Sequence, residues 1–82
     1  MSYVVYILES INCGRHYIGQ TNNMAGRLKR HNTGQVLSTK AYKPWKLIYS
    51  QEFETRSEAV RYELYLKSLK NKEQLNKIII AG

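Results

Sequence analysis

The apolar positions of the chain predict three β-strands. Residues 3–9, YVVYILE, are β-branched and aromatic and are apolar on both faces, which is typical of a central strand covered on each side. The turn residues INCG separate this run from a second short strand, RHYIGQ, so residues 3–20 are predicted to form a hairpin. A third strand, WKLIYSQEF, is predicted over residues 45–53, and Pro44 disfavours helix immediately before it.

The remaining periodic segments predict three helices. They cover about Met24 to His31 or Asn32, residues 56–69, and a last short helix that begins at about Asn71 and ends at Ile80. Gly34 follows the first helix where a left-handed cap is favourable, and Thr55 with Glu58 makes a capping box for the second. Residues 35–44 are expected to form an exposed basic loop. The order β-β-α-β-α-α predicts an α+β fold: a small three-stranded antiparallel sheet, with the first strand central, flanked by helices.

Charge is the most informative feature of the composition. The 82 residues carry 13 Lys and Arg against six acids, a net charge of +7, with no Asp. No acid lies between Arg27 and Lys46, a stretch that holds six basic side chains. Such a patch attracts polyanions by neutralising phosphates and releasing their counterions, so nucleic acid is the expected partner, although many small proteins are merely basic. The candidate nucleic-acid contacts are Lys29, Arg30, Lys40 and Lys43.

Length and composition exclude several other classes of protein. A single domain over residues 1–82 is expected from the length. No apolar run approaches the roughly 20 residues that span a bilayer, and the N-terminus lacks the features of a signal peptide. Cys13 is the one cysteine, which excludes an internal disulfide and a cysteine-rich zinc site. The chain is therefore expected to act in a reducing cytoplasm and not at a membrane.

The first predicted helix carries two candidate catalytic side chains. Met24 and Leu28 are four residues apart and form its inward stripe, and Arg27 and His31, also four apart, lie at the edge of that stripe. They would project together from the rim of the core. The alternative is that both belong to a solvated helix edge.

The second helix carries a carboxylate close to its apolar stripe. Glu63 lies within about 40° of Ala59 on the helical wheel. A carboxylate on a core-facing stripe needs a partner or a cation. Lys67, one turn later, would provide an ordinary ion pair. Because the chain has no Asp, Glu63 is also the best candidate metal ligand, and Mg²⁺ is commonly held by one or two carboxylates with water and substrate phosphate.

The chain has seven tyrosines and only one phenylalanine. Most of the tyrosines can be explained as strand residues whose ring is buried while the hydroxyl group reaches water. Tyr6 and Tyr17 differ because they lie on adjacent strands of one hairpin, where their hydroxyls could share a face. A register shift of one residue would separate them, and the sequence leaves the turn length open. Pattern alone does not make these tyrosines catalytic.

Taken in order, these residues resemble a known set of motifs. Tyr6 lies in VVYIL, YIG occupies residues 17–19, GQT leads to Arg27 and His31, and SEAVRYE ends at Glu63. This set resembles the GIY-YIG nuclease superfamily, and most closely its small stand-alone bacterial members, over nearly the whole chain. The family's fold is a three-stranded antiparallel sheet with the first strand central and helices flanking it. That fold agrees with the strands predicted above.

The resemblance implies a divalent-metal-dependent endonuclease that uses Mg²⁺ or Mn²⁺. DNA is the expected substrate rather than RNA, with branched or damaged DNA in a repair role as one option and intact DNA as the other. By position, Glu63 resembles the family's metal-binding glutamate and Arg27 its catalytic arginine. Tyr6 and Tyr17 resemble its motif tyrosines, and His31 the partner that some members place one turn after the arginine. Tyr6 is favoured as the base, with a nearby cation stabilising its anion, and Tyr17 as the residue that orients water, or the reverse.

Two departures from the family's pattern affect this expectation. The first motif is Val4-Val5-Tyr6, so only its tyrosine is kept. Many relatives also have an asparagine beyond the glutamate, and neither Asn71 nor Asn76 falls in a convincing motif here. If that residue supports the site, weak activity or a need for a partner is expected. The alternative function is a non-cleaving basic module that binds DNA or RNA.

Overall fold

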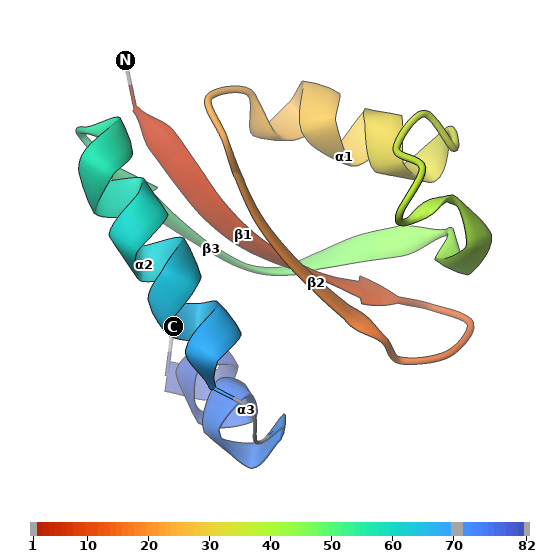
Figure 1. Ribbon diagram of the computed structural model, residues 1–82. Helices are drawn as coiled ribbons and strands as arrows, with labels where there is room; N and C mark the ends of the chain where they lie inside the picture. The colour runs from red at the N-terminus through yellow and green to blue at the C-terminus, as the bar shows by residue number, and fades with distance from the viewer. Residues whose placement is uncertain (1, 70–71, 82) are drawn as a thin grey trace.

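A twisted sheet of three antiparallel strands organises the chain, with helices on both of its faces (Figure 1). The computed structural model describes residues 2–69 and 72–81. The strands are β1 (Tyr3–Ser10), β2 (His16–Thr21) and β3 (Trp45–Phe53), and the helices are α1 (Met24–Asn32), α2 (Arg56–Ser68) and α3 (Lys72–Ala81), with a 3-10 turn, η1, at Lys40–Tyr42. The predicted α+β fold and element order are confirmed. No helix in the described part of the chain has the length and apolar character needed to cross a membrane.

The strand order is β2-β1-β3, so the strand that is apolar on both faces is the central one, as predicted. In the β1–β2 pair Tyr6 lies opposite Gly19 and Leu8 lies opposite Tyr17. Residues two apart on a strand share a face, so Tyr6 and Tyr17 are diagonal neighbours on one face of the sheet. The hairpin register, which the sequence left open, therefore brings the two tyrosines together.

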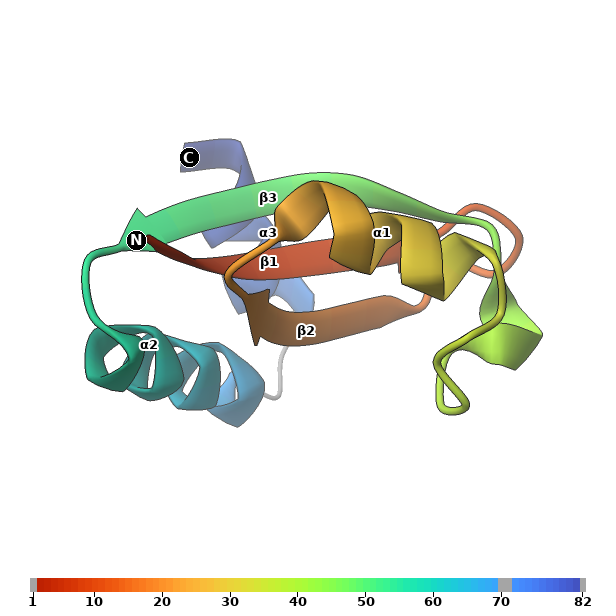
Figure 2. The ribbon, with the colours of Figure 1, turned by 90° about the horizontal axis from the view of Figure 1, so that it is seen from above.

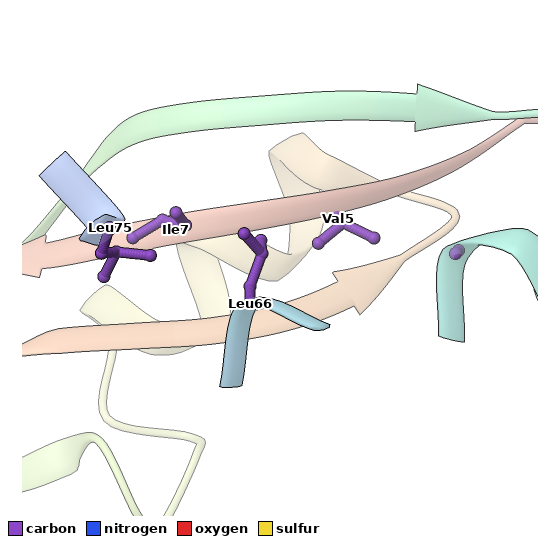
Figure 3. Close-up of a cluster of buried hydrophobic side chains, with 5 residues drawn as sticks. Val5, Ile7, Leu66 and Leu75 are labelled. Atoms are coloured by element: carbon purple, nitrogen blue, oxygen red, sulfur yellow. The ribbon is translucent and has the colours of Figure 1, made fainter. Parts of the chain in front are cut away.

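One face of β1 forms a core with α2 and α3 (Figure 3). Val5 and Ile7 on β1 are fully buried and pack with Leu66 of α2 and Leu75 of α3. Each large-to-small change in such a core costs about 2–5 kcal/mol of stability. This core fixes α2 against the sheet and so sets the position of the side chains that α2 carries.

The opposite face of β1 packs against α1, and Figure 2 shows α1 and α3 on opposite sides of the sheet. Tyr6 and Leu8 are buried here with Trp45 at the start of β3, and Met24 and Leu28 of α1 pack against them. The predicted inward stripe of the first helix is thus confirmed. Tyr6 is both a core residue and a candidate for chemistry.

Local hydrogen bonds fix where the two site helices begin. The Asn23 side chain accepts a hydrogen bond from the backbone N–H of Gly26 at the start of α1. At the start of α2, Thr55 Oγ1 accepts from the backbone N–H of Glu58, as the capping box predicts. The Glu58 carboxylate returns to Thr55 through the side-chain hydroxyl, which donates to Glu58 Oε1 at 2.9 Å. Gly34, just beyond α1, has a φ of 79°, which is the left-handed conformation expected of it.

Residues 35–44 are mostly exposed, as expected, but Thr39 within this loop is buried. Thr39 is only 1% exposed, and its backbone carbonyl accepts a hydrogen bond from the Trp45 indole at 3.0 Å. The Asn32 side chain bonds both the N–H and the carbonyl of Trp45. The loop is therefore tied to the end of α1 and to β3 through a buried tryptophan, and these contacts lacked any periodic signal in the sequence.

Candidate functional site

A pocket of about 440 Å³ lies where β1 and β2 meet the helices α1 and α2. It is lined by Tyr3, Tyr6, Tyr17, Gly19, Gln20, Thr21, Asn22, Arg27, Arg56 and Glu63. Four of the five sequence-predicted catalytic and metal-binding residues, Tyr6, Tyr17, Arg27 and Glu63, are among them. They come from four different elements, so only the folded chain brings them together.

Tyr6 and Tyr17 form one wall of this pocket. Their ring centroids are 6.3 Å apart, and both lie on the α1 face of the sheet. Gly19 makes room for them, because a Cβ atom at this position would lie 2.6 Å from the Tyr6 hydroxyl oxygen. In the sequence, Gly19 was notable only as the glycine of the YIG motif. Its position inside a predicted strand could have indicated the close contact, because a glycine within a strand often marks the close approach of another group.

His31 lies behind Tyr6 and does not line the pocket. Its side chain is buried, with 1% of the residue exposed. The alternative that His31 lies on a solvated edge of the helix is therefore wrong. His31 Nε2 is 3.2 Å from the Tyr6 hydroxyl oxygen, and His31 Nδ1 is 2.7 Å from Thr39 Oγ1. The ring also lies 4.8 Å from the ring of Tyr17, centroid to centroid. Both ring nitrogens of His31 are therefore engaged inside the protein.

The surroundings of Tyr6 and His31 keep both groups neutral. Burial raises the pKa of the Tyr6 hydroxyl above its ordinary value of 10.0, and Tyr17 raises it further, while Arg27 acts in the opposite direction. Burial lowers the pKa of His31 below its ordinary value of 6.5, and the charges of Arg27 and Arg30 lower it further. Of the cations expected to favour a Tyr6 anion, Arg27 does lower the pKa of Tyr6, but burial outweighs it.

Glu63 reaches the pocket from the middle of α2 with its side chain 16% exposed. Its Oε2 lies 2.6 Å from Nζ of Lys67, a side chain that is 51% exposed. Glu63 therefore lines the pocket and also makes the ion pair with Lys67 that its position on the helix predicted. No group of three His, Cys, Asp or Glu side chains suited to a metal occurs among residues 2–69 and 72–81. One carboxylate in an open polar pocket fits a hard cation such as Mg²⁺, which keeps several waters, better than zinc.

Arg56 is a pocket residue that sequence analysis missed. It is the first residue of α2 and precedes Glu63 by seven positions, or two helical turns, so both side chains lie on one face of the helix. The seven-residue spacing between Arg56 and Glu63 is the feature of the sequence that could have placed Arg56 beside the glutamate. Arg27 from α1 and Arg56 from α2 give the pocket two guanidinium groups, which suit the planar, multidentate binding of phosphate.

The predicted nucleic-acid contacts divide into two groups. Arg30 lines a second pocket of about 280 Å³ that shares Arg27 with the first. Lys29, Lys40 and Lys43 are exposed and line neither of these pockets, and the last two lie beside Gly34 near the other end of α1. Asn76 is exposed on α3 and also lines neither pocket, and Asn71 lies outside the described residues.

Comparisons with known proteins agree with the family resemblance and with the fold. Residues 2–77 match the GIY-YIG catalytic domain. The chain is 45% identical over 76 residues to a UPF0213 protein of Bacillus licheniformis, covering 89% of this chain and 77% of that protein. It is 33% identical over 78 residues to a UPF0213 protein of Staphylococcus aureus, covering 94% of each. A solution NMR structure of a UPF0213 protein from Bacillus halodurans has a TM-score of 0.61 and 30% identity, covering 100% of this chain and 87% of that one.

Proposed function

The chain belongs to the GIY-YIG family, a family of nuclease type, and we propose that it is a divalent-metal-dependent endonuclease that hydrolyses phosphodiester bonds in DNA. One observation carries the proposal: Tyr6, Tyr17, Arg27 and Glu63 come from four elements and line one pocket. The pocket combines two arginines with a carboxylate and two phenol groups. This is a donor set suited to binding a phosphate and transferring a proton beside it.

Glu63 is the residue that would hold the metal, Mg²⁺ or Mn²⁺. When bound there, the metal would supply positive charge to a phosphate and its leaving oxygen. The geometry that supports this role is a carboxylate of low exposure whose protein partner, Lys67, lies at an exposed position from which it can withdraw.

Arg27 is proposed to bind the non-bridging oxygens of the scissile phosphate. It is half-buried, lines the pocket and stands on a helix whose start is fixed by the Asn23 cap. Planar guanidinium donors offset charge that grows on these oxygens during attack, and they do so best when already held in place. Arg56, on the α2 side of the pocket, is proposed to hold a neighbouring phosphate.

Tyr6 and His31 are proposed to move the proton of the attacking water. Because burial disfavours the Tyr6 anion, Tyr6 acts as a relay. Its hydroxyl proton passes to His31 Nε2 while its oxygen takes a proton from the water, whose oxygen bonds to phosphorus as the P–O bond to the leaving group breaks. Tyr17 orients that water. The leaving oxygen takes up a proton from solvent, and after product release His31 returns its own proton to solvent through Tyr6.

DNA with branched or damaged structure, in a repair role, is the proposed substrate. A net charge of +7 and the adjoining pocket at Arg30 support a polyanionic substrate that extends beyond one phosphate. Lys29, Lys40 and Lys43 are proposed to contact the backbone further away. The second candidate function is a non-cleaving DNA- or RNA-binding module, which the 2.6 Å pair of Glu63 with Lys67 favours because that pair already satisfies the carboxylate.

Cleavage by the purified protein tests the two functions against each other. Supercoiled plasmid and branched DNA are incubated with Mg²⁺, Mn²⁺ or EDTA, using wild-type protein, Glu63→Ala and the charge-matched control Glu52→Ala at an exposed position on β3. The endonuclease proposal expects nicking that needs metal, is lost in Glu63→Ala and is kept in Glu52→Ala. Salt-sensitive binding without cleavage of any substrate, indifferent to metal, would establish the binding module instead.

A further inference from the structure

Thr39 supports His31 from the loop that follows α1, eight residues further along the chain, where no catalytic motif lies. Thr39 and His31 are both 1% exposed, and Thr39 Oγ1 is 2.7 Å from His31 Nδ1. The Thr39 hydroxyl also donates toward the carbonyl oxygen of Val36 at 3.4 Å. Together with the contact from Tyr6 to Nε2, these bonds make a continuous chain from Tyr6 through His31 and Thr39 to the Val36 carbonyl, buried as far as Thr39.

Counting protons distinguishes the two neutral tautomers of His31. With the proton on Nδ1, each link has one donor: Tyr6 O–H to Nε2, Nδ1–H to Thr39 Oγ1, and Thr39 O–H to the Val36 carbonyl. With the proton on Nε2, Thr39 must donate to Nδ1 and its bond to Val36 is lost. The first arrangement satisfies three bonds and the second only two, so the chain of contacts favours the Nδ1–H tautomer.

We propose that Thr39 is a positioning residue that holds His31 in the Nδ1–H tautomer, so that Nε2 is free to accept the Tyr6 hydroxyl proton. The inference rests on the proposed function, because Nε2 must be an acceptor for the relay through Tyr6. The bond that the second ring nitrogen makes determines the tautomer of a histidine and the orientation of its ring.

The fold holds Thr39 in place independently of any substrate. Its backbone N–H donates to the Val36 carbonyl at 3.2 Å, and its own carbonyl accepts from the Trp45 indole at 3.0 Å. Trp45 is in turn bonded by the side chain of Asn32, which directly follows His31. The same end of α1 thus carries the histidine and anchors the segment that orients it.

The groups facing His31 favour a neutral ring before the reaction. Tyr6 on β1 and Tyr17 on β2 contact the ring, and Arg27 and Arg30 on α1 are the charged groups nearby. When Nε2 takes the Tyr6 proton, Nδ1–H remains bonded to Thr39 Oγ1. Thr39 therefore keeps its role through the proton transfer without gaining or losing a proton overall.

The tautomer can be measured directly by long-range ¹H–¹⁵N NMR of the imidazole rings at neutral pH. The chain has two histidines, and His16, which pairs with Glu9, provides an internal reference. Wild-type protein is expected to show Nδ1 as the protonated nitrogen of His31 and Nε2 as the acceptor. Thr39→Val, which keeps the shape but removes the hydroxyl, is expected to shift His31 towards the other tautomer, and Thr39→Ser is expected to restore it. An Nε2–H signal in wild-type protein, or an unchanged ratio in Thr39→Val, would overturn the proposal.

Cleavage kinetics then separate this inference from the proposed function. Thr39→Val is expected to lower kcat about tenfold or more with KM little changed, and Thr39→Ser to recover most of the rate, as for other residues that orient a catalytic imidazole. An undiminished kcat in Thr39→Val would overturn the positioning role. Absence of cleavage by wild-type protein would overturn the proposed function, whereas the NMR result decides alone whether Thr39 sets the tautomer.

Discussion

Gly19 lies directly opposite Tyr6 in the β1–β2 pair, and the Tyr6 hydroxyl fills the place that a side chain at residue 19 would take. A Cβ atom there would lie 2.6 Å from the Tyr6 hydroxyl oxygen, 2.8 Å from Tyr6 Cζ and 3.1 Å from Tyr17 Cε1. The YIG motif therefore requires glycine at position 19 for a steric reason: a larger residue would collide with Tyr6. The glycine of β2 lets the tyrosine of β1 reach across the neighbouring strand to the pocket.

Gly19→Ala is expected to destabilise the protein by about 1–3 kcal/mol, as for an added methyl in a packed site. The new methyl group pushes the Tyr6 ring away from His31 and Tyr17. Urea unfolding measures the loss. In a Tyr6→Phe background, where the closest atom is absent, Gly19→Ala is expected to cost less. Equal costs in the two backgrounds would mean that the methyl group is accommodated by movement elsewhere.

Much of the fold followed from local patterns in the sequence. The run over residues 3–9 is apolar on both faces because β1 is buried between α1 on one side and α2 with α3 on the other. The capping box at Thr55 fixed the start of α2 because its bonds join residues three apart. Such contacts are short in sequence, so propensity and spacing suffice to predict them.

The site was predictable only in part, because several of its contacts join positions that no sequence pattern links. The two ring nitrogens of His31 are engaged by a loop residue, Thr39, and a strand residue, Tyr6, and no periodicity relates these three positions. Whether Tyr6 and Tyr17 share a face depended on the hairpin register, which one inserted residue in the turn would have changed. The family resemblance suggested roles for Tyr6 and Tyr17, and the register of the hairpin places the two side chains on one face of the sheet.

Lys67 is expected to compete with a metal ion for Glu63. Lys67→Gln frees the Glu63 carboxylate and is expected to tighten Mn²⁺ binding by at most about fivefold, because exposed ion pairs contribute about 0.2–1 kcal/mol. Titration calorimetry with Mn²⁺ gives the affinity, and Lys77→Gln, at an exposed position of α3, controls for the change in net charge. Weaker binding in Lys67→Gln alone would show that Lys67 orients the carboxylate.

Arg56 is expected to bind a phosphate of the nucleic acid. Arg56→Gln should weaken DNA binding and reduce the slope of log K against log [salt] by about 0.7–0.9, the effect of losing one phosphate contact. Fluorescence anisotropy over a salt series measures both quantities. Arg61→Gln removes the same charge from an exposed position on the same helix that lines neither the main pocket nor the one beside it. Equal slopes for the two variants would indicate a general charge effect instead of a contact in the pocket.

His31 makes the stability of the protein depend on pH in the mildly acidic range. Burial, with Arg27 and Arg30, lowers the pKa of His31 in the folded state below the ordinary 6.5 that it has in the unfolded chain. Between those two values the unfolded chain binds more protons than the folded one, so stability rises with pH there. The stability that depends on a neutral His31 is fully present above about pH 6.5 and is lost as the pH falls below that value.

The free energy of unfolding is therefore expected to fall as pH is lowered from 7 towards 5, and His31→Gln is expected to flatten that dependence. Urea unfolding at several pH values at constant ionic strength measures both proteins. The pKa of the Glu9 carboxyl is lowered from 4.5, chiefly by its hydrogen bond to His16. Glu9 therefore changes the free energy of unfolding only at a pH below this range. Because the neutral ring is also the proton acceptor of the proposed relay, kcat should fall on the same acidic side. A stability that is flat from pH 7 to 5 in the wild-type protein would mean that His31 accepts a proton in the folded state as readily as in the unfolded chain.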